Sequence, residues 1–214
     1  MTATALRRAP ATRARAPRTQ AQRRDETRAA LLDAAVASLV AGGFARTTTL
    51  EVQRRAGVSR GALLHHFPSK AELLVATIAH LAEMRGRDLR QRAASLPTGP
   101  ARIEAVLDLL WECFAGPLFQ VSLELRAAAR TDAELRAPLV SAERAVHERI
   151  LHQAAALFGP EVAGRPGFAA AMDLTLHLMM GAAMTTLTHS DEPRVATRIH
   201  QWKTLFPTLL EKIP

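Results

Sequence analysis

Several residue types are scarce in this chain of 214 residues, and each scarcity excludes a class of structure. There is no tyrosine, and aromatic residues make up only 4% of the chain. The single cysteine, Cys113, cannot form an internal disulfide, which is typical of a reducing compartment, and its apolar helical surroundings favour inert packing over redox chemistry. No run approaches the roughly 18 consecutive apolar residues of a membrane span, and residues 1–20 lack the apolar stretch of a signal peptide. We therefore expect a cytoplasmic protein with no membrane partner.

Acidic residues are absent before Asp25, where all seven basic residues are arginines. The first 70 residues carry 13 basic and 4 acidic residues, a net charge of +9, whereas the remaining 144 carry 15 and 16, a net charge of −1. This asymmetry is typical of a chain that meets a polyanion at one end. Residues 1–24 contain little to bury, so we predict a disordered basic tail that either solubilises the protein or adds DNA contacts.

Strand patterns are also missing, because no alternation of apolar and polar residues lasts longer than a few positions. From residue 25 onward, apolar residues recur at helical spacing between glycine and proline breaks. We predict an all-α fold of about nine helices, with a loop at 159–167, a stop at Gly42-Gly43 and a kink or early end at Pro207. The predicted helices span residues 25–41, 48–56, 59–66, 69–93, 101–115, 118–130, 133–158, 166–189 and 193–212.

Residues 48–67 contain a short helix, a glycine turn and a second short helix. Thr48 and Glu51 form a capping-box pattern, Gly57 permits the turn, and Ser59 is suited to cap the second helix. Five apolar residues have the spacing to lock the two helices together: Val52, Ala56, Val58, Leu63 and Phe67. This is the helix-turn-helix arrangement, which can place its second helix in the major groove of DNA.

The residues of this motif resemble the signature of the TetR family of regulators. The runs Ala56-Gly57-Val58-Ser59-Arg60-Gly61-Ala62-Leu63 and His66-Phe67-Pro68-Ser69-Lys70 are similar to it, and the segment 43–49 is similar to the family's link before it. The resemblance is specific over residues 25–85. It implies a helix-turn-helix domain there, with a three-helix arrangement, and a helical ligand-sensing and dimerisation domain at 86–214.

The resemblance also implies which residues contact DNA. The set is Arg46, Thr48, Thr49, Ser59, Arg60, Gly61, Ala62, Leu64, His65, His66 and Lys70. Within it, Thr48 and Lys70 would hold phosphates at helix starts, and a lysine beside a helix N-terminus suits an anion. Leu64 departs from the family's usual tyrosine, so one phosphate contact is lost or comes from His65 or the tail. Gln53 replaces the family's usual alanine and either faces solvent or touches DNA.

For the C-terminal region, the resemblance implies a homodimer formed by the last two long helices, about 166–189 and 193–212. The same apolar stripes would also serve to fill the core of one subunit. A ligand pocket is expected among the helices of residues 101–180, where aromatic and methionine walls suit an apolar or weakly polar molecule. Each of its candidate residues is also compatible with simple core packing: Trp111, Phe114, Phe119, Leu123, His147, His177 and Met180.

Together these features predict a sequence-specific transcriptional regulator. In the leading hypothesis it is a repressor whose dimer leaves a palindromic operator on double-stranded DNA when a small-molecule inducer binds. An activator and a non-specific nucleic-acid binder driven by the arginine tail are the alternatives. The chain carries no nucleophile–base pattern, no phosphate loop and no set of metal ligands beside His65-His66, so we expect no enzyme activity, no cofactor and no metal.

Overall fold

The computed structural model describes residues 19–114, 116–187 and 192–212, which form ten helices and no strand. The all-α prediction is therefore confirmed for the described residues. The helix absent from the prediction is α8, a single turn inside the segment expected to be a loop. The helices are α1 (Gln20–Arg46), α2 (Thr49–Ala56), α3 (Arg60–His66), α4 (Lys70–Ala93), α5 (Ala101–Phe114), α6 (Pro117–Ala129), α7 (Ala133–Phe158), α8 (Pro160–Ala163), α9 (Phe168–Thr186) and α10 (Glu192–Lys212).

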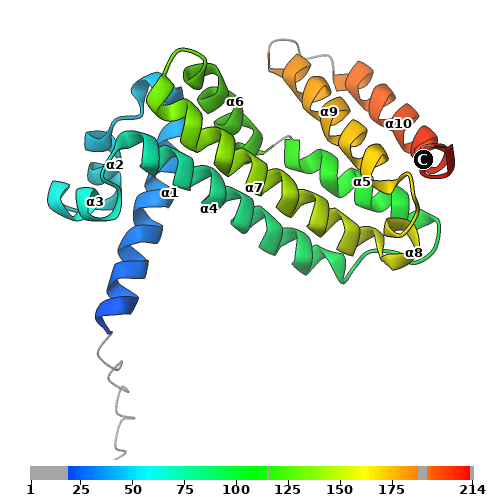
Figure 1. Cartoon of the computed structure of the whole chain (residues 1–214), viewed down its shortest axis with the longest axis horizontal. Helices are drawn as coiled ribbons and strands as arrows, with labels where there is room; N and C mark the ends of the chain where they lie inside the picture. Colours follow the sequence, from blue (N-terminus) through cyan, green and yellow to red (C-terminus); the bar gives the residue numbers. More distant parts are fainter. Residues whose placement is uncertain (1–18, 115, 188–191, 213–214) are drawn as a thin grey trace, which may run out of the picture.

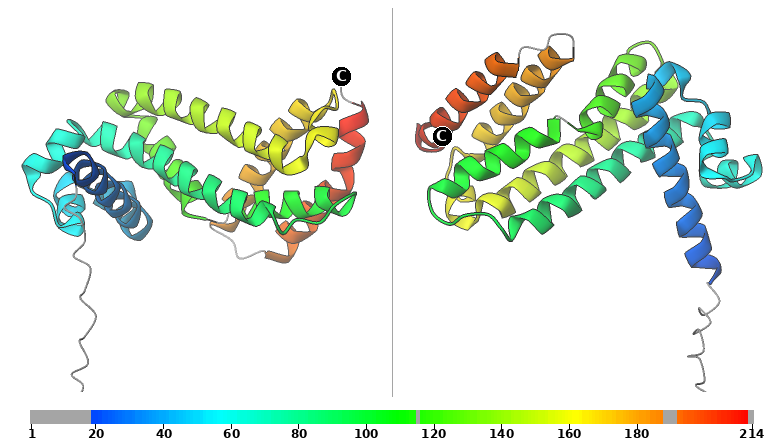
Figure 2. Two further views of the ribbon diagram at one scale, coloured as in Figure 1. Left: turned by 90° about the horizontal axis from the view of Figure 1, so that it is seen from below. Right: turned by 180° about the vertical axis from the view of Figure 1, so that it is seen from behind.

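The helices form an elongated body with a small head at one end (Figure 1). We call α1, α2, α3 and the first turn of α4 the head. Helices α4 and α7 run side by side along the body, and α5, α9 and α10 pack at the end far from the head (Figure 2). The first turns of α1 project beyond the rest of the head.

Three hydrophobic cores follow one another along the body, and α4 contributes to all of them. Leu73 lies in the core of the head, Ile78 in the middle core with α6 and α7, and Leu89 in the distal core with α5, α9 and α10. The predicted domain boundary between residues 85 and 86 falls within this one helix. Because a helix in which each turn is packed moves as a rigid rod, α4 links the head mechanically to the distal end.

Side chains cap the helices of the head at the residues expected from sequence. Thr48, Ser59 and Ser69 each accept a hydrogen bond from the backbone N–H three residues later, which satisfies one free donor at each helix start. Gly57 has a φ of 67° in the left-handed region, where a side chain is strained. The turn between α2 and α3 therefore depends on glycine at this position.

The start and end of α1 differ from the prediction. The helix begins at Gln20, where Thr19 and Gln22 form a complete capping box, so the predicted disordered segment 1–24 is wrong for residues 19–24. Residues 1–18 of that segment lie outside the described residues. At the other end α1 extends to Arg46 across a break at Gly43, whose φ is 67°. The glycine pair therefore interrupts the helix as expected, but helical turns continue beyond it.

Proline 207 does not shorten the last helix, because α10 continues through it to Lys212. The expected early end is therefore wrong. Pro138 is likewise accommodated inside α7. Each proline removes one backbone donor, but packing of the helix against its neighbours outweighs the loss of a single hydrogen bond.

Two described helices, α1 and α9, are long and apolar enough to cross a membrane by length and composition. This differs from the expectation that no segment approaches that character. The apolar side of α1 is engaged within the protein, where Leu31 and Ala35 are fully buried in the head core. In α9, Met172 and Met179 are fully buried in the distal core, while Leu174 and Met184 remain about half exposed.

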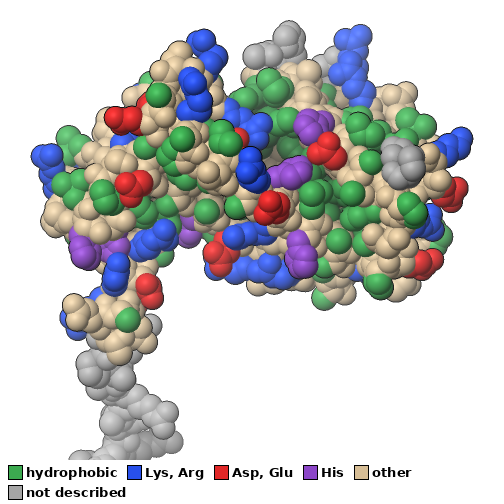
Figure 3. Space-filling model, in the orientation of Figure 1, with side chains coloured by type: hydrophobic (Ala, Val, Ile, Leu, Met, Phe, Trp, Pro, Cys, Tyr) green, Lys and Arg blue, Asp and Glu red, His purple; other side chains and the backbone are tan. Residues whose placement is uncertain are grey.

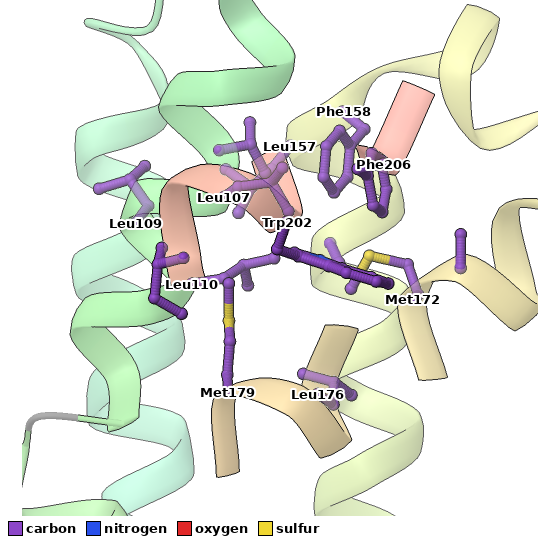
Figure 4. Packing of buried hydrophobic residues seen from close by; sticks show 14 of the residues in the cluster. Leu107, Leu109, Leu110, Leu157, Phe158, Met172, Leu176, Met179, Trp202 and Phe206 are labelled. Atoms are coloured by element: carbon purple, nitrogen blue, oxygen red, sulfur yellow. The ribbon is translucent and has the colours of Figure 1, made fainter. Parts of the chain in front are cut away.

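The distal core is built around aromatic residues of α7 and α10 (Figure 4). Phe158 and Phe206 stack with ring centroids 5.3 Å apart, and Trp202 packs edge-on to Phe206. The indole Nε1 of Trp202 donates a hydrogen bond of 3.0 Å to Oγ1 of the buried Thr175 on α9. This contact fixes the position of α10 on α9 because both polar atoms are satisfied away from water.

Candidate nucleic-acid interface and ligand cavity

The second helix of the helix-turn-helix, α3, is held by one buried side and presents the other to solvent. Val52, Leu63 and Phe67 are at most 3% exposed and pack together in the head core, with Ala56 and Val58 against them. The predicted interlocking residues are therefore confirmed as a packed set. Among the predicted groove-facing residues, the exposed ones are Ser59, Arg60, Gly61, Leu64 and His65, while Ala62 and His66 are half-buried.

Two hydroxyls at helix starts are both capping groups and available donors. Oγ1 of Thr48 accepts from the N–H of Glu51, and Oγ of Ser59 accepts from the N–H of Ala62. A hydroxyl that accepts one hydrogen bond can still donate its own proton. The capping bonds hold both side chains in place, and both residues are exposed. Their hydroxyl protons are therefore available to donate to a phosphate or a base.

The surface of α3 is open at Gly61. A Cβ atom built there would meet only Oγ of Ser59, at 4.0 Å. No other group of the described chain approaches it, so this position leaves room for a close approach by another molecule. Such open space is a requirement for the predicted groove contact at Gly61.

Two cations predicted to contact DNA also have contacts inside the protein. Arg46 donates through Nε and Nη2 to the carbonyl oxygens of Gly42 and Ala41, so it caps the end of α1. The ammonium of Lys70 lies 4.3 Å from the centroid of the Phe44 ring, and burial lowers the pKa of Lys70. These contacts leave further N–H donors on both side chains, so a phosphate contact by either one is compatible with them.

The arginines of α2 are partly neutralised by one carboxylate. Nε of Arg54 and Nε of Arg55 donate to the carboxylate of Glu51 at 3.1 and 2.8 Å. These bonds, first from Arg55 and then from Arg54, lower the pKa of Glu51. One carboxylate thus shares two guanidinium groups on the face of α2, and these arginines contribute less net charge than the sequence suggests.

Positive groups gather instead at the C-terminal end of α3. Burial lowers the pKa of His66, and the positive surroundings of His65, Arg24 and Arg28 lower it further, while Asp25 opposes them. At neutral pH the His66 ring is therefore held uncharged and offers one N–H as a donor. The guanidinium of Arg28 lies 5.2 Å from the centroid of Phe67, the residue that ends α3.

A cavity of about 460 Å³ lies behind the head, among α4, α5, α6, α7 and α9. Six of the seven predicted pocket residues line it: Phe114, Phe119, Leu123, His147, His177 and Met180. Trp111 is not among the lining residues and packs against the distal core. Most of the lining is apolar, and Figure 3 shows histidine and charged side chains gathered at the middle of the face between the two ends of the body.

Several lining residues were not singled out from sequence. Five of them come from α4: Ile78, Ala82, Arg85, Gly86 and Leu89. They follow a helical period of three or four residues, which is the one sequence signal that places them on a common face. The sequence pattern alone does not say that this face meets a cavity, because the same period describes a packed core.

Charged groups at the cavity are paired with one another. Nε of Arg126 donates to Glu143 at 2.6 Å, joining α6 to α7, and Nη1 of Arg126 contacts Sδ of Met180 at 3.6 Å. His147 and His177 both lie near the carboxylate of Asp173, at 3.8 and 3.5 Å. Among the described residues, no group of three or more His, Cys, Asp or Glu is placed to hold a metal ion.

The single cysteine also lines this cavity. Nε of Arg85 donates to Sγ of Cys113 at 3.2 Å, and Nη1 of Arg85 pairs with Asp88 at 3.1 Å. Burial raises the pKa of the Cys113 thiol, and the neighbouring guanidinium only partly offsets this effect. The neutral thiol is a poor nucleophile, so the expectation of inert packing agrees with the surroundings of Cys113.

Comparison with known proteins identifies the family. The sequence model of the protein family described as "Bacterial regulatory proteins, tetR family" matches residues 31–77. An HTH-type transcriptional regulator of Mycobacterium bovis is 33% identical over 167 residues, which cover 78% of this chain and 86% of that protein. This chain belongs to the TetR family. It is a DNA-binding transcriptional regulator, and its family consists of regulators rather than enzymes.

Other members of the TetR family share parts of the chain or its fold. The regulator CymR of Pseudomonas putida is 43% identical over 119 residues, which are 56% of this chain and 59% of CymR. A transcriptional regulator from Rhodococcus has a TM-score of 0.63 at 21% identity, covering 86% of this chain and 95% of that one. At this identity the structural likeness shows the fold alone.

Two solved neighbours of this TetR-family chain contain small molecules. FadR from Bacillus subtilis, in complex with stearoyl-CoA, has a TM-score of 0.60 at 15% identity and covers 83% of this chain and 96% of its own. A regulator from Saccharomonospora viridis, in complex with choline, has a TM-score of 0.58 at 15% identity and covers 86% and 96%. The two ligands differ widely in size and charge and belong to those proteins.

In this member of the TetR family, Leu64 occupies an exposed position on α3. Its side chain is 42% exposed and has no hydrogen-bond donor. The exposed His65 follows it directly and forms an edge-to-face contact with His66 at 5.6 Å. A phosphate contact at this end of α3 therefore falls to the histidines or to neighbouring arginines.

Proposed function

We propose that this regulator is a repressor, that it binds a palindromic operator as a homodimer, and that a small molecule in the cavity releases it from DNA. The observation that carries this proposal is the course of α4. Leu73 of α4 is buried in the same head core as Leu63 of α3, and four turns later Leu89 lines the cavity. A molecule that favours a different position of α4 would thereby favour a different position of α3.

The lining of the cavity supports a ligand with an apolar body and one polar group. A volume of about 460 Å³ falls within the range of small-molecule sites. Aromatic and aliphatic side chains form most of the wall, while Arg126, Gln153 and His147 offer hydrogen bonds from α6 and α7. Because these side chains can donate hydrogen bonds, they favour an apolar molecule that carries a hydrogen-bond acceptor at one end.

The exposed apolar surface of α9 and α10 supports the homodimer. Three large apolar side chains on these helices are 47–55% exposed: Leu174, Met184 and Leu205. Monomeric proteins seldom expose large apolar patches. A groove between the two helices is lined in part by Gly181, where an added Cβ would contact nothing, and by Trp202. A second copy packing here would bring two heads to one duplex, as paired half-sites require.

We expect a charge in this surface to separate the subunits. Leu205→Glu would place a carboxylate in the proposed interface, so the dimer should dissociate at least 100-fold more readily, because an unpaired buried charge costs several kcal/mol. Sedimentation velocity over a concentration series measures this shift. Val140→Glu on α7, where the side chain is similarly exposed at 52%, is the matched control and should stay dimeric. Two variants with equal sedimentation would contradict the proposed interface.

Operator preference and ligand release form the direct test of the proposed function. Fluorescence anisotropy would compare DNA from upstream of the protein's own gene with a scrambled duplex, at several salt concentrations. We expect at least 10³-fold preference at moderate salt, about the lower end of specific regulators. Equal binding of the two duplexes would instead indicate a non-specific nucleic-acid binder.

A cavity-filling variant connects ligand release to the cavity. A thermal-shift screen of small acids, amines and neutral amphipathic compounds, with choline and stearoyl-CoA included, would find molecules that stabilise the protein. Ser122→Trp, which fills the cavity from α6, should keep operator affinity and lose at least 10-fold in affinity for such a molecule. Ser141→Trp, on the exposed side of α7, is the control. A ligand that binds both variants alike does not use this cavity.

A further inference from the structure

The first turns of α1 extend beyond the core of the head. Its first buried residue is Leu31, eleven positions after Gln20, so about 16 Å of helix projects outward at 1.5 Å per residue. Figures 1 and 2 show this part of α1 leading away from α2 and α3. The capping box of Thr19 and Gln22 closes the helix start, so the projecting turns are a formed helix rather than a frayed end.

One face of α1 changes from apolar to basic at the point where α3 ends. Leu31 and Leu32 pack in the head core with Leu63 of α3. One turn earlier on the same face, Arg28 stacks over Phe67, the residue that follows α3. One turn before that, Arg24 continues this face into solvent. The side of α1 that supports α3 therefore continues past it as a line of guanidinium groups.

The projecting turns carry a net charge of +1, because Arg23, Arg24 and Arg28 outnumber Asp25 and Glu26. The salt bridges between described residues include neither Arg24 nor Arg28, in contrast to Arg54 and Arg55 of α2, which share Glu51. Arg24 and Arg28 also stand close enough to His66 to lower its pKa. Like charges gathered in this way repel one another, and a polyanion would remove that repulsion. Figure 3 shows basic and histidine side chains together at this side of the head.

We propose that the projecting turns of α1, through Arg24 and Arg28, form a second DNA contact that binds phosphates beside the segment entered by α3. The proposal rests on the proposed function in one respect, namely that the exposed face of α3 enters the major groove. Charge complementarity and continuity with the exposed end of α3 identify the partner as the same duplex. Such contacts position the protein on DNA and carry no base preference.

The salt dependence of binding tests this contact directly. In Arg24→Gln/Arg28→Gln, two phosphate contacts per chain are removed, so the slope of log affinity against log salt should become shallower by about 1.8 per bound chain. Affinity at moderate salt should fall at least 10-fold, while the ratio between operator and scrambled DNA stays nearly constant. Arg90→Gln/Arg144→Gln removes the same charge from exposed positions of α4 and α7 and should leave the slope unchanged.

Hydroxyl-radical footprinting locates the contact on the duplex. The wild-type protein should protect backbone positions beside those protected by α3, and the arginine variant should lose only these flanking protections. Because Arg28 also packs on Phe67, Arg24→Gln alone provides a variant that leaves this packing intact. An unchanged slope and an unchanged footprint in both arginine variants would overturn the proposal.

Two further results separate the possible explanations. One tells a phosphate contact by α1 from a contact by residues 1–18, and the other shows whether the proposed function itself is wrong. If deleting residues 1–18 removes the flanking protections while the arginine variants keep them, the contact belongs to the preceding arginines of the chain and the proposal for α1 is wrong. If the wild-type protein binds operator and scrambled DNA alike, the proposed function fails, but the change in salt slope still measures whether α1 contacts phosphates.

Discussion

Gly61→Glu should abolish operator binding while leaving the fold intact. A Cβ atom at this position would contact only Oγ of Ser59, at 4.0 Å, and glutamate favours a helix more than glycine does. The carboxylate would stand on the exposed face of α3, where it would meet the phosphates and base edges of the groove. Like charges brought together at an interface cost several kcal/mol, so affinity should fall more than about 100-fold for each head.

The measurement is anisotropy on operator DNA together with a thermal melt of each protein. Ala156→Glu introduces the same charge on an exposed turn of α7 at the far end of the body, and it should bind DNA within about twofold of the wild type, since only longer-range repulsion remains. If Gly61→Glu melts normally and retains operator affinity, the exposed face of α3 does not enter the groove and the proposed interface is wrong.

Trp202→Ala should be the most destabilising single change in the distal core. The indole is 9% exposed, packs against Phe206 and donates a hydrogen bond to the fully buried Thr175. Removing it leaves a cavity and takes away the hydrogen bond accepted by Thr175, whose hydroxyl still donates to the carbonyl of Ala171, at a combined cost of about 3–5 kcal/mol. For a chain of this size, that loss lowers the melting temperature by roughly 6–20 °C.

Trp202→Phe separates packing from hydrogen bonding. Phenylalanine keeps an aromatic ring beside Phe206 but cannot donate to Thr175, so its cost should be smaller, about 1–3 kcal/mol. Thermal unfolding followed by circular dichroism ranks the melting temperatures of the wild type and the two variants. Sedimentation shows whether the loss of α10 packing also weakens the dimer. A melting temperature for Trp202→Ala within about 2 °C of the wild type would show that α10 is not held on α9 by this contact.

Several features of the head could be predicted because they depend on residues only a few positions apart. The caps at Thr48, Ser59 and Ser69 and the left-handed turn at Gly57 each involve a backbone group within four residues. The buried spacing of Val52 and Leu63 follows from helical periodicity in the same way. These short-range interactions are sufficient to locate the helix-turn-helix without any tertiary contact.

The ligand cavity was predictable only in part, because it depends on how whole helices are rotated. On α5, Leu110, Cys113 and Phe114 share the face that lines the cavity. Trp111 follows Leu110 by one position, which turns its side chain by about 100° away from that face, and it is not among the lining residues. The wall formed by α4 was missed for the same reason: Gly86 permits a close approach by Gln153 of α7, a residue 67 positions away, and a Cβ at 86 would lie 2.2 Å from its Nε2.

The sequence by itself determined the helical class, the site of the helix-turn-helix and the concentration of positive charge at one end of the chain, since composition and short-range spacing govern all three. Only the tertiary structure decided how the charges are used. It placed Lys70 on Phe44, Arg46 at the end of α1 and Arg28 on Phe67 beside α3. The physical reason is that the partner of a long cationic side chain is whichever ring, carbonyl or carboxylate the packing of helices brings within its reach.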